Sequence, residues 1–136
     1  MKFETMKHGI QFRITENEDN YSIDDYWNAA VEVFTKNIDK TIKYFQTECT
    51  DEEFYWSSEL FEGIAAATKS MELVEVWRAR LAAVTAETYN QAGFQSELMR
   101  QWVDYKEYVR SVGDEIGYAD GKIFLLMNPQ AFPEGV

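Results

Sequence analysis

Hydrophobic residues recur every three or four positions along most of the chain, and this spacing predicts a series of α-helices. Polar breaks and capping residues separate the helices. The predicted helices cover residues 23–47, 51–67, 71–84 and 94–112, with one further helical turn between 85 and 92. We expect the first to be the most buried, because a wide apolar stripe that includes Trp27 and Phe34 runs along it.

The outward side of the first predicted helix carries opposite charges four positions apart. Glu32 precedes Lys36 and Asp39 precedes Lys43 at this spacing, which is typical of a solvated helix face. In the last predicted helix, Leu98 and Trp102 belong to one narrow inward face, and Gly113 ends the helix.

Two short segments near the chain ends have strand-like patterns. In residues 9–14, GIQFRI, apolar and polar residues alternate, and residues 122–127, KIFLLM, follow an Asp-Gly turn signal. We expect these segments to pair as a small two-stranded sheet supported by the helices. The predicted fold is a single, mainly α domain over residues 1–136. It is an antiparallel helical bundle, whose hairpins allow a HEAT-like arrangement, with this β element formed by the termini.

The segment from Cys49 to Ser70 combines an apolar face with an acidic, aromatic one. Thr50 and Glu53 form a capping-box pattern, so the helix should begin at Asp51. No basic residue lies between Lys43 and Lys69, and the acids therefore lack cationic partners within their own segment. We expect this face to be free to contact another protein, with Trp56 at its edge. Its candidate contact residues are Asp51, Glu52, Tyr55, Trp56, Glu59 and Glu62.

The formal net charge of -11 limits the partners that the chain can bind. It disfavours nucleic acid and anionic membranes and favours a cationic protein, although acidity that only serves solubility is an equally common explanation. A second acidic block, residues 15–22, contains Glu16, Glu18 and Asp19, which we expect to form a second contact region. This block lacks the glycine and the final glutamate of a calcium-binding loop.

The sequence contains none of the common phosphate-binding, metalloprotease, hydrolase or redox motifs. The only histidine, His8, has no recognisable catalytic partner, and the only cysteine, Cys49, continues an apolar stripe. Helix-borne carboxylate pairs exist, but a di-metal site of the bundle type also needs histidines on the helices. We therefore expect no enzyme activity, no metal and no cofactor. The single cysteine and the lack of a signal-type segment favour the cytoplasm.

Residues 47–81, TECTDEEFYWSSELFEGIAAATKSMELVEVWRARL, and the ETYN that follows resemble the small helical immunity proteins encoded beside toxins in bacterial contact-dependent inhibition and related polymorphic toxin systems. The resemblance extends over about residues 22–110. It implies a cytoplasmic protein without activity of its own that binds one cognate toxin domain, often a cationic nuclease, and blocks its active site or substrate surface.

Three functional hypotheses follow from the sequence. The first is an immunity protein, monomeric or weakly dimeric, that uses the acidic contact residues named above. The second is an acidic adaptor or nucleic-acid mimic that acts on a DNA- or RNA-binding protein. The third is a structural homo-oligomer that associates through Tyr26, Val33 and Tyr44.

Overall fold

The computed structural model describes residues 1–131, and this part of the chain is mainly helical. Its α-helices are α1 (Met6–Thr15), α2 (Ile23–Thr35), α3 (Ile38–Lys43), α4 (Asp51–Ser57), α5 (Phe61–Thr68), α6 (Met71–Ala82), α7 (Ala86–Gln91), α8 (Glu97–Trp102) and α9 (Tyr105–Met127). Shorter turns are η1 (Glu18–Asn20), the π-helical η2 (Tyr44–Glu48), η3 (Ser58–Leu60) and η4 (Pro129–Ala131). The domain expected over residues 1–136 extends past this range, and residues 132–136 lie outside it.

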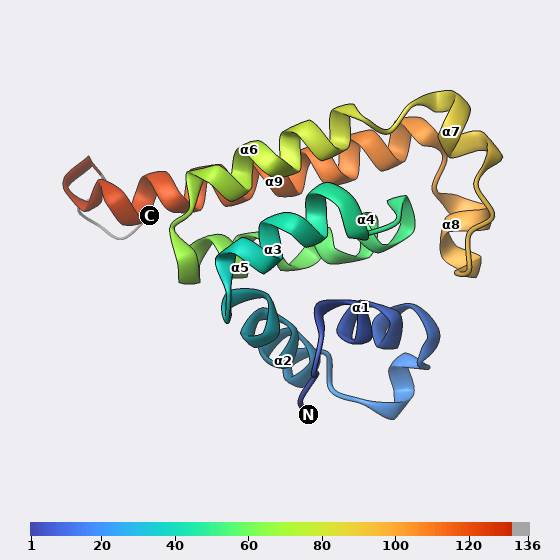
Figure 1. Ribbon diagram of the computed structural model, residues 1–136, viewed down its shortest axis with the longest axis horizontal. Helices are drawn as coiled ribbons and strands as arrows, with labels where there is room; N and C mark the ends of the chain where they lie inside the picture. Colours follow the sequence, from blue (N-terminus) through green and yellow to red (C-terminus); the bar gives the residue numbers. More distant parts are fainter. Residues whose placement is uncertain (132–136) are drawn as a thin grey trace.

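Helix α9 is the longest element, and it runs alongside α6 in Figure 1. Helix α5 packs against α9, and α1 packs against both α2 and α4. Aromatic side chains fill the core between these elements: the rings of Phe61 and Trp77 stack with centroids 4.0 Å apart, and Phe45 contacts both edge-on. The core therefore joins segments that are distant along the chain.

The predicted two-stranded sheet is wrong, because both of its segments are helical and residues 1–131 contain no strand. Residues 9–14 lie in α1, where Thr5 caps the helix by accepting a hydrogen bond from the His8 amide at 3.0 Å. Residues 122–127 form the last turns of α9, which continues through the predicted stop at Gly113. A short apolar run is compatible with both a strand and a helix, and here packing against the rest of the chain favours the helix.

Two predicted helices are each divided by a capping residue. Asn37 caps α3 and so ends the first helix near residue 36, and Asp104 caps α9. The pairs Glu32–Lys36 and Asp39–Lys43 are not formed: in the described chain, neither pair lies within 4.0 Å. Both pairs keep their helical spacing, but these exposed side chains remain separate on a solvated face.

Several local predictions are confirmed, whereas some burial assignments are not. The Thr50–Glu53 capping box is present, α4 begins at Asp51, and Ser70 caps α6. Trp27, predicted on the buried stripe, is 39% exposed. The surface considered for self-association is buried in the core of the chain itself, so it is not available to a second copy; it comprises Tyr26, Val33 and Tyr44.

Within residues 1–131, no helix has the length and apolar character required to cross a membrane.

Candidate protein-binding site

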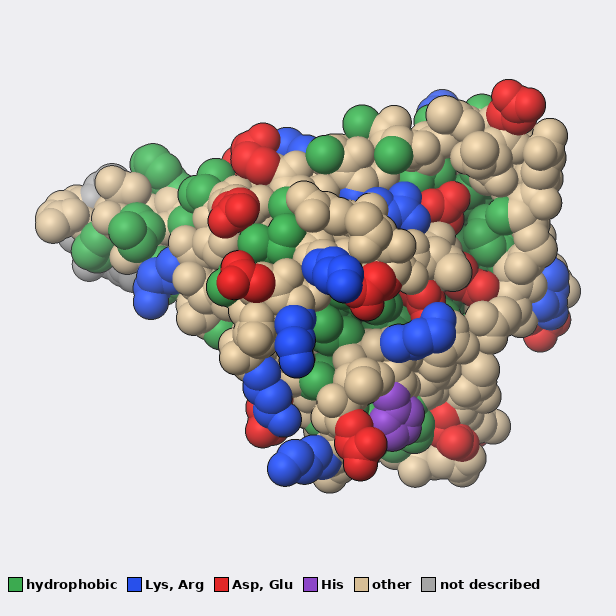
Figure 2. All heavy atoms as spheres, in the orientation of Figure 1, with side chains coloured by type: hydrophobic (Ala, Val, Ile, Leu, Met, Phe, Trp, Pro, Cys, Tyr) green, Lys and Arg blue, Asp and Glu red, His purple; other side chains and the backbone are tan. Residues whose placement is uncertain are grey.

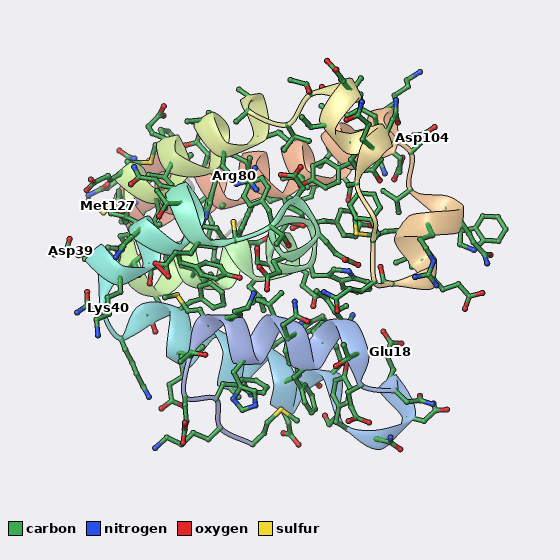
Figure 3. All side chains as sticks on the ribbon, turned by 45° about the vertical axis from the view of Figure 1, so that its right-hand side comes forward. Glu18, Asp39, Lys40, Arg80, Asp104 and Met127 are labelled. Atoms are coloured by element: carbon green, nitrogen blue, oxygen red, sulfur yellow. The ribbon has the colours of Figure 1, made fainter. Side chains whose placement is uncertain are left out.

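Three shallow hollows meet around α8, and Leu98 lines all of them. Leu98 is 43% exposed and Trp102 is 74% exposed, although both were predicted to face inward. Figure 3 shows this side of the molecule, with Glu18 after α1 and Asp104 at the start of α9 near its two ends. We name this surface the α8 face. Its acids are Glu16, Glu18, Glu59, Glu97, Asp104, Glu107 and Glu115, its bases are Arg13, Arg100, Lys106 and Arg110, and its large aromatic and apolar residues include Tyr55, Trp56, Leu98 and Trp102.

Helix α8 is held in place by the buried carboxylate of Glu52. Its two oxygens accept hydrogen bonds from the backbone amides of Gln95 and Ser96, each at 2.8 Å. The Ser96 side chain in turn caps α8, and Met99 anchors the helix in the core. A short helix that would be marginal alone is therefore fixed by a charged capping contact from α4.

Arg13 lies at the centre of the α8 face and joins the two predicted contact regions. Its guanidinium donates to Glu59 at 2.8 Å and to Glu18 at 2.5 Å, and it lies 5.1 Å from the ring centroid of Trp56. Burial alone would lower the pKa of the Arg13 guanidinium. Its hydrogen bonds with Glu59 and Glu18 outweigh this effect and raise the pKa. Arg13 therefore remains a permanent cation between two acidic segments.

Two aromatic side chains form the wall of the smallest hollow, whose volume is about 230 Å³. The Tyr55 ring stacks on Tyr108 with centroids 5.7 Å apart and meets Trp56 edge-on. Burial raises the pKa of Tyr55, so its hydroxyl stays protonated. The indole nitrogen Nε1 of Trp56 is buried and has no hydrogen-bond partner in residues 1–131. Half-buried aromatic side chains held this rigidly suit a protein contact.

The expectation that the acids of residues 51–62 lack cationic partners is wrong for Asp51, Glu53 and Glu59, which pair with bases from distant parts of the chain. Asp51 pairs with Arg80 at 2.7 Å, and Glu59 pairs with Arg13. Glu52 is only 5% exposed, so it supports α8 from inside and presents no free carboxylate. These bases come from segments about 30 to 46 residues away, and a local reading of the sequence cannot assign them.

The remaining predicted residues lie at or near the surface. Glu16 and Glu18 line the same hollow as Trp56, so the structure brings the loop region to the aromatic residues. Glu62 and Asp19 are exposed, and neither forms an ion pair in the described chain. Their role in binding a partner stays a prediction.

Sequence reasoning missed several residues of this face, among them Arg13, Leu98, Trp102 and Glu115. The pattern Asp104-x-x-Glu107 could have revealed part of this face. An N-cap inside a predicted helix indicates that one helix ends and another begins there, so residues before the break need not face the same way as residues after it. Glu115 is half-buried, and its pKa is raised first by burial and then by the nearby charges of Glu62, Glu59 and Asp114. This carboxylate has no basic partner within 4.0 Å in the described range.

Residues 1–131 hold no group of three or more histidine, cysteine, aspartate or glutamate side chains that could bind a metal ion. His8 is exposed and contacts Phe3 edge-on, and Cys49 is buried with a pKa raised by burial, which makes the thiol a poor nucleophile. The chain matches no protein-family model, no curated protein and no solved structure.

Proposed function

We propose that this chain is an immunity protein that binds a cognate bacterial toxin domain through the α8 face and occludes the toxin's active site or substrate surface. The observation that carries the proposal is the exposure of Trp102 and Leu98 on a helix fixed by the buried Glu52. A large exposed aromatic on a rigid support has the character of an interface hot spot.

The chemistry around this anchor favours a cationic partner. Carboxylates outnumber basic groups along the α8 face, and Glu97 and Glu115 have no basic partner in residues 1–131. A nuclease toxin is cationic where it holds phosphates, so an acidic inhibitor can be steered to that surface and cover it. The inhibitor needs no catalytic group, and it acts in the cytoplasm, where the toxin must be neutralised.

The proposal changes the roles of the predicted contact residues. Tyr55, Trp56 and Glu59 belong to the α8 face itself, with Glu16 and Glu18 on the same surface. Glu62 and Asp19 are exposed candidates at the margin. Asp51 and Glu52 act indirectly, because their carboxylates bind this chain's own Arg80 and α8 backbone.

The proposal is tested by capture from the native host followed by a toxicity assay. The chain is used as bait under high-salt washing, and any retained protein is then expressed alone and together with the chain. We expect one retained partner that is toxic alone and harmless in the presence of the chain. Trp102→Ala should abolish protection, whereas Trp27→Ala, which changes an exposed tryptophan on α2, should not. Protection that survives Trp102→Ala would contradict this site.

An acidic nucleic-acid mimic predicts a different result. A mimic should bind several unrelated cationic proteins weakly and release them in salt. The internal ion pairs of Asp51, Glu18 and Glu59 favour the immunity function over the mimic, because carboxylates already held by arginines imitate phosphates poorly.

A further inference from the structure

The chain has a second candidate site, a lysine-rich hollow at the N-terminal end of α1, whereas Arg13 lies in the last turn of that helix. Its volume is about 430 Å³, within the range of small-molecule sites. Lys7, Lys36, Lys40 and Lys43 line it, together with the acids Glu4 and Glu48. Figure 2 shows Lys and Arg side chains gathered over the part of this face where α2 and α3 lie. Such a concentration of bases is unexpected in a chain of net charge -11.

Three of these lysines are not engaged by acids. In residues 1–131, Lys36, Lys40 and Lys43 have no carboxylate oxygen within 4.0 Å, and their amino groups donate no hydrogen bond. Lys40 projects from α3 at the edge of the molecule in Figure 3. Lys7 is the exception, because it donates to Glu53 at 2.9 Å. Arg13, Arg78, Arg80 and Arg110 each form an ion pair with a carboxylate of the chain, whereas these three lysines gather around one hollow without such a partner.

The floor of the hollow contains a buried polar group without a partner. Tyr44 lines the hollow and is only 2% exposed, and its hydroxyl makes no hydrogen bond within the described chain. Its ring is fixed by edge-on contacts with Phe34 and Phe45 at 5.6 and 5.2 Å. Because the hydroxyl itself is buried, Tyr44 contributes a rigid ring to the wall of the hollow and leaves the lysine amino groups as its main polar contacts.

From this juxtaposition we infer that the hollow binds a small molecule with two or more phosphate groups. The phosphates would meet the amino groups of Lys36, Lys40 and Lys43. Lysine is a common phosphate ligand because its three donors can rotate toward a strongly anionic group. Met6 and Val33, which also line the hollow, would support any less polar part of the molecule.

This site is separate from the proposed toxin-binding surface, since the two share no lining residue. The test titrates the full chain with tripolyphosphate, adenosine triphosphate, adenosine and inorganic phosphate by calorimetry, and follows the backbone amides by NMR. We expect saturable binding of the first two, with amide shifts confined to residues around the hollow. Tighter binding of the nucleotide than of tripolyphosphate would identify a nucleotide as the source of the phosphates, and equal binding would identify the phosphates alone.

The decisive variant is Lys36→Gln/Lys40→Gln/Lys43→Gln, which should weaken tripolyphosphate binding at least about tenfold. Its matched control, Lys69→Gln/Lys106→Gln/Lys122→Gln, makes the same change in net charge at residues that do not line the hollow and should weaken binding less than about twofold. Absence of saturable binding up to about 10 mM, or equal affinity of the two triple variants, would overturn the inference.

Discussion

Arg13 holds Glu59 with two guanidinium nitrogens, at 2.8 and 3.3 Å, although 46 positions separate the two residues. This contact ties α1 to the turn between α4 and α5 and places Arg13 against Trp56. Part of the acidic segment is therefore neutralised by bases from elsewhere in the chain, and a partner can contact only the side chains that these internal pairs leave exposed.

Arg13→Met should destabilise the fold. The substitution leaves Glu59 and Glu18 without their shared cation in a partly buried setting, and we expect the free energy of unfolding to fall by about 2 kcal/mol in urea denaturation. Arg110→Met is the matched control, because Arg110 is exposed and pairs with Glu107 and Asp114 at the surface. It should change stability little. Equal stability of the two variants would show that the Arg13 contacts contribute nothing.

Glu52→Ala should loosen α8 specifically. The amides of Gln95 and Ser96 lose their acceptor in a buried position, which should cost about 2 kcal/mol of unfolding free energy. Hydrogen exchange should become faster at these two amides and along α8, and toxin protection should weaken although Trp102 is unchanged. Glu97→Ala alters an exposed carboxylate on the same helix and should leave the exchange pattern intact. Unchanged exchange in Glu52→Ala would contradict its positioning role.

Glu53 should contribute to acid unfolding. Burial alone would raise the pKa of Glu53, but hydrogen bonds from Gln11, the Thr50 amide and Lys7 outweigh it and lower the pKa below 4.5. Because the folded-state pKa is the lower one, the stabilisation is complete above the unfolded-state pKa and is lost as the pH falls through the folded-state value. Glu53→Gln should therefore lower stability at pH 7 and flatten its decrease below about pH 4.5, measured by urea denaturation across pH.

Glu115 should affect the pH dependence of stability in the opposite direction from Glu53. Its pKa is raised by burial and by Glu62, Glu59 and Asp114, so its ionised form opposes folding above the folded-state pKa. Glu115→Gln should stabilise the fold at pH 7 by roughly 0.5 kcal/mol after allowance for solvent screening, and the gain should vanish at pH values below the unfolded-state pKa. The same sign of effect at pH 7 for Glu53→Gln and Glu115→Gln would contradict these assignments.

The glycines of α9 offer a test of its helical continuation. A Cβ atom at Gly117 or Gly121 would meet nothing within 4 Å, so alanine at either position should stabilise the helix by about 0.5–1 kcal/mol. Gly9→Ala is the control in α1, because its Cβ would lie 3.1 Å from the Phe3 ring and should lose this gain. Thermal melting compares the three variants. Destabilisation by Gly117→Ala would contradict a helix at this position.

The sequence correctly predicted two helix starts that depend on local interactions, although it missed the equally local caps at Asn37 and Asp104. The capping box of Thr50 and Glu53 correctly placed the start of α4, and the apolar spacing correctly placed α6. The strand predictions failed because Ile10, Phe12 and Ile14 fit an alternating pattern as well as a helical one, and only packing distinguishes them. The site was found in part: Tyr55, Trp56 and Glu59 lie on the α8 face, but the partners of Glu52 and Glu59 are more than 40 residues away.

Glu62→Lys tests whether the exposed acid Glu62, at the edge of the α8 face, contributes to partner binding. Combining it with Glu59→Lys would also break the Arg13 contact, so a loss of binding could then reflect altered structure. Glu62 is exposed and unpaired in the described chain, and reversing its charge should reduce the association rate for the cognate toxin about threefold at low salt, with the dissociation rate unchanged. Glu72→Lys makes the same charge change on α6 and should have a smaller effect in surface plasmon resonance. Identical association rates for the two variants would place Glu62 outside the interface.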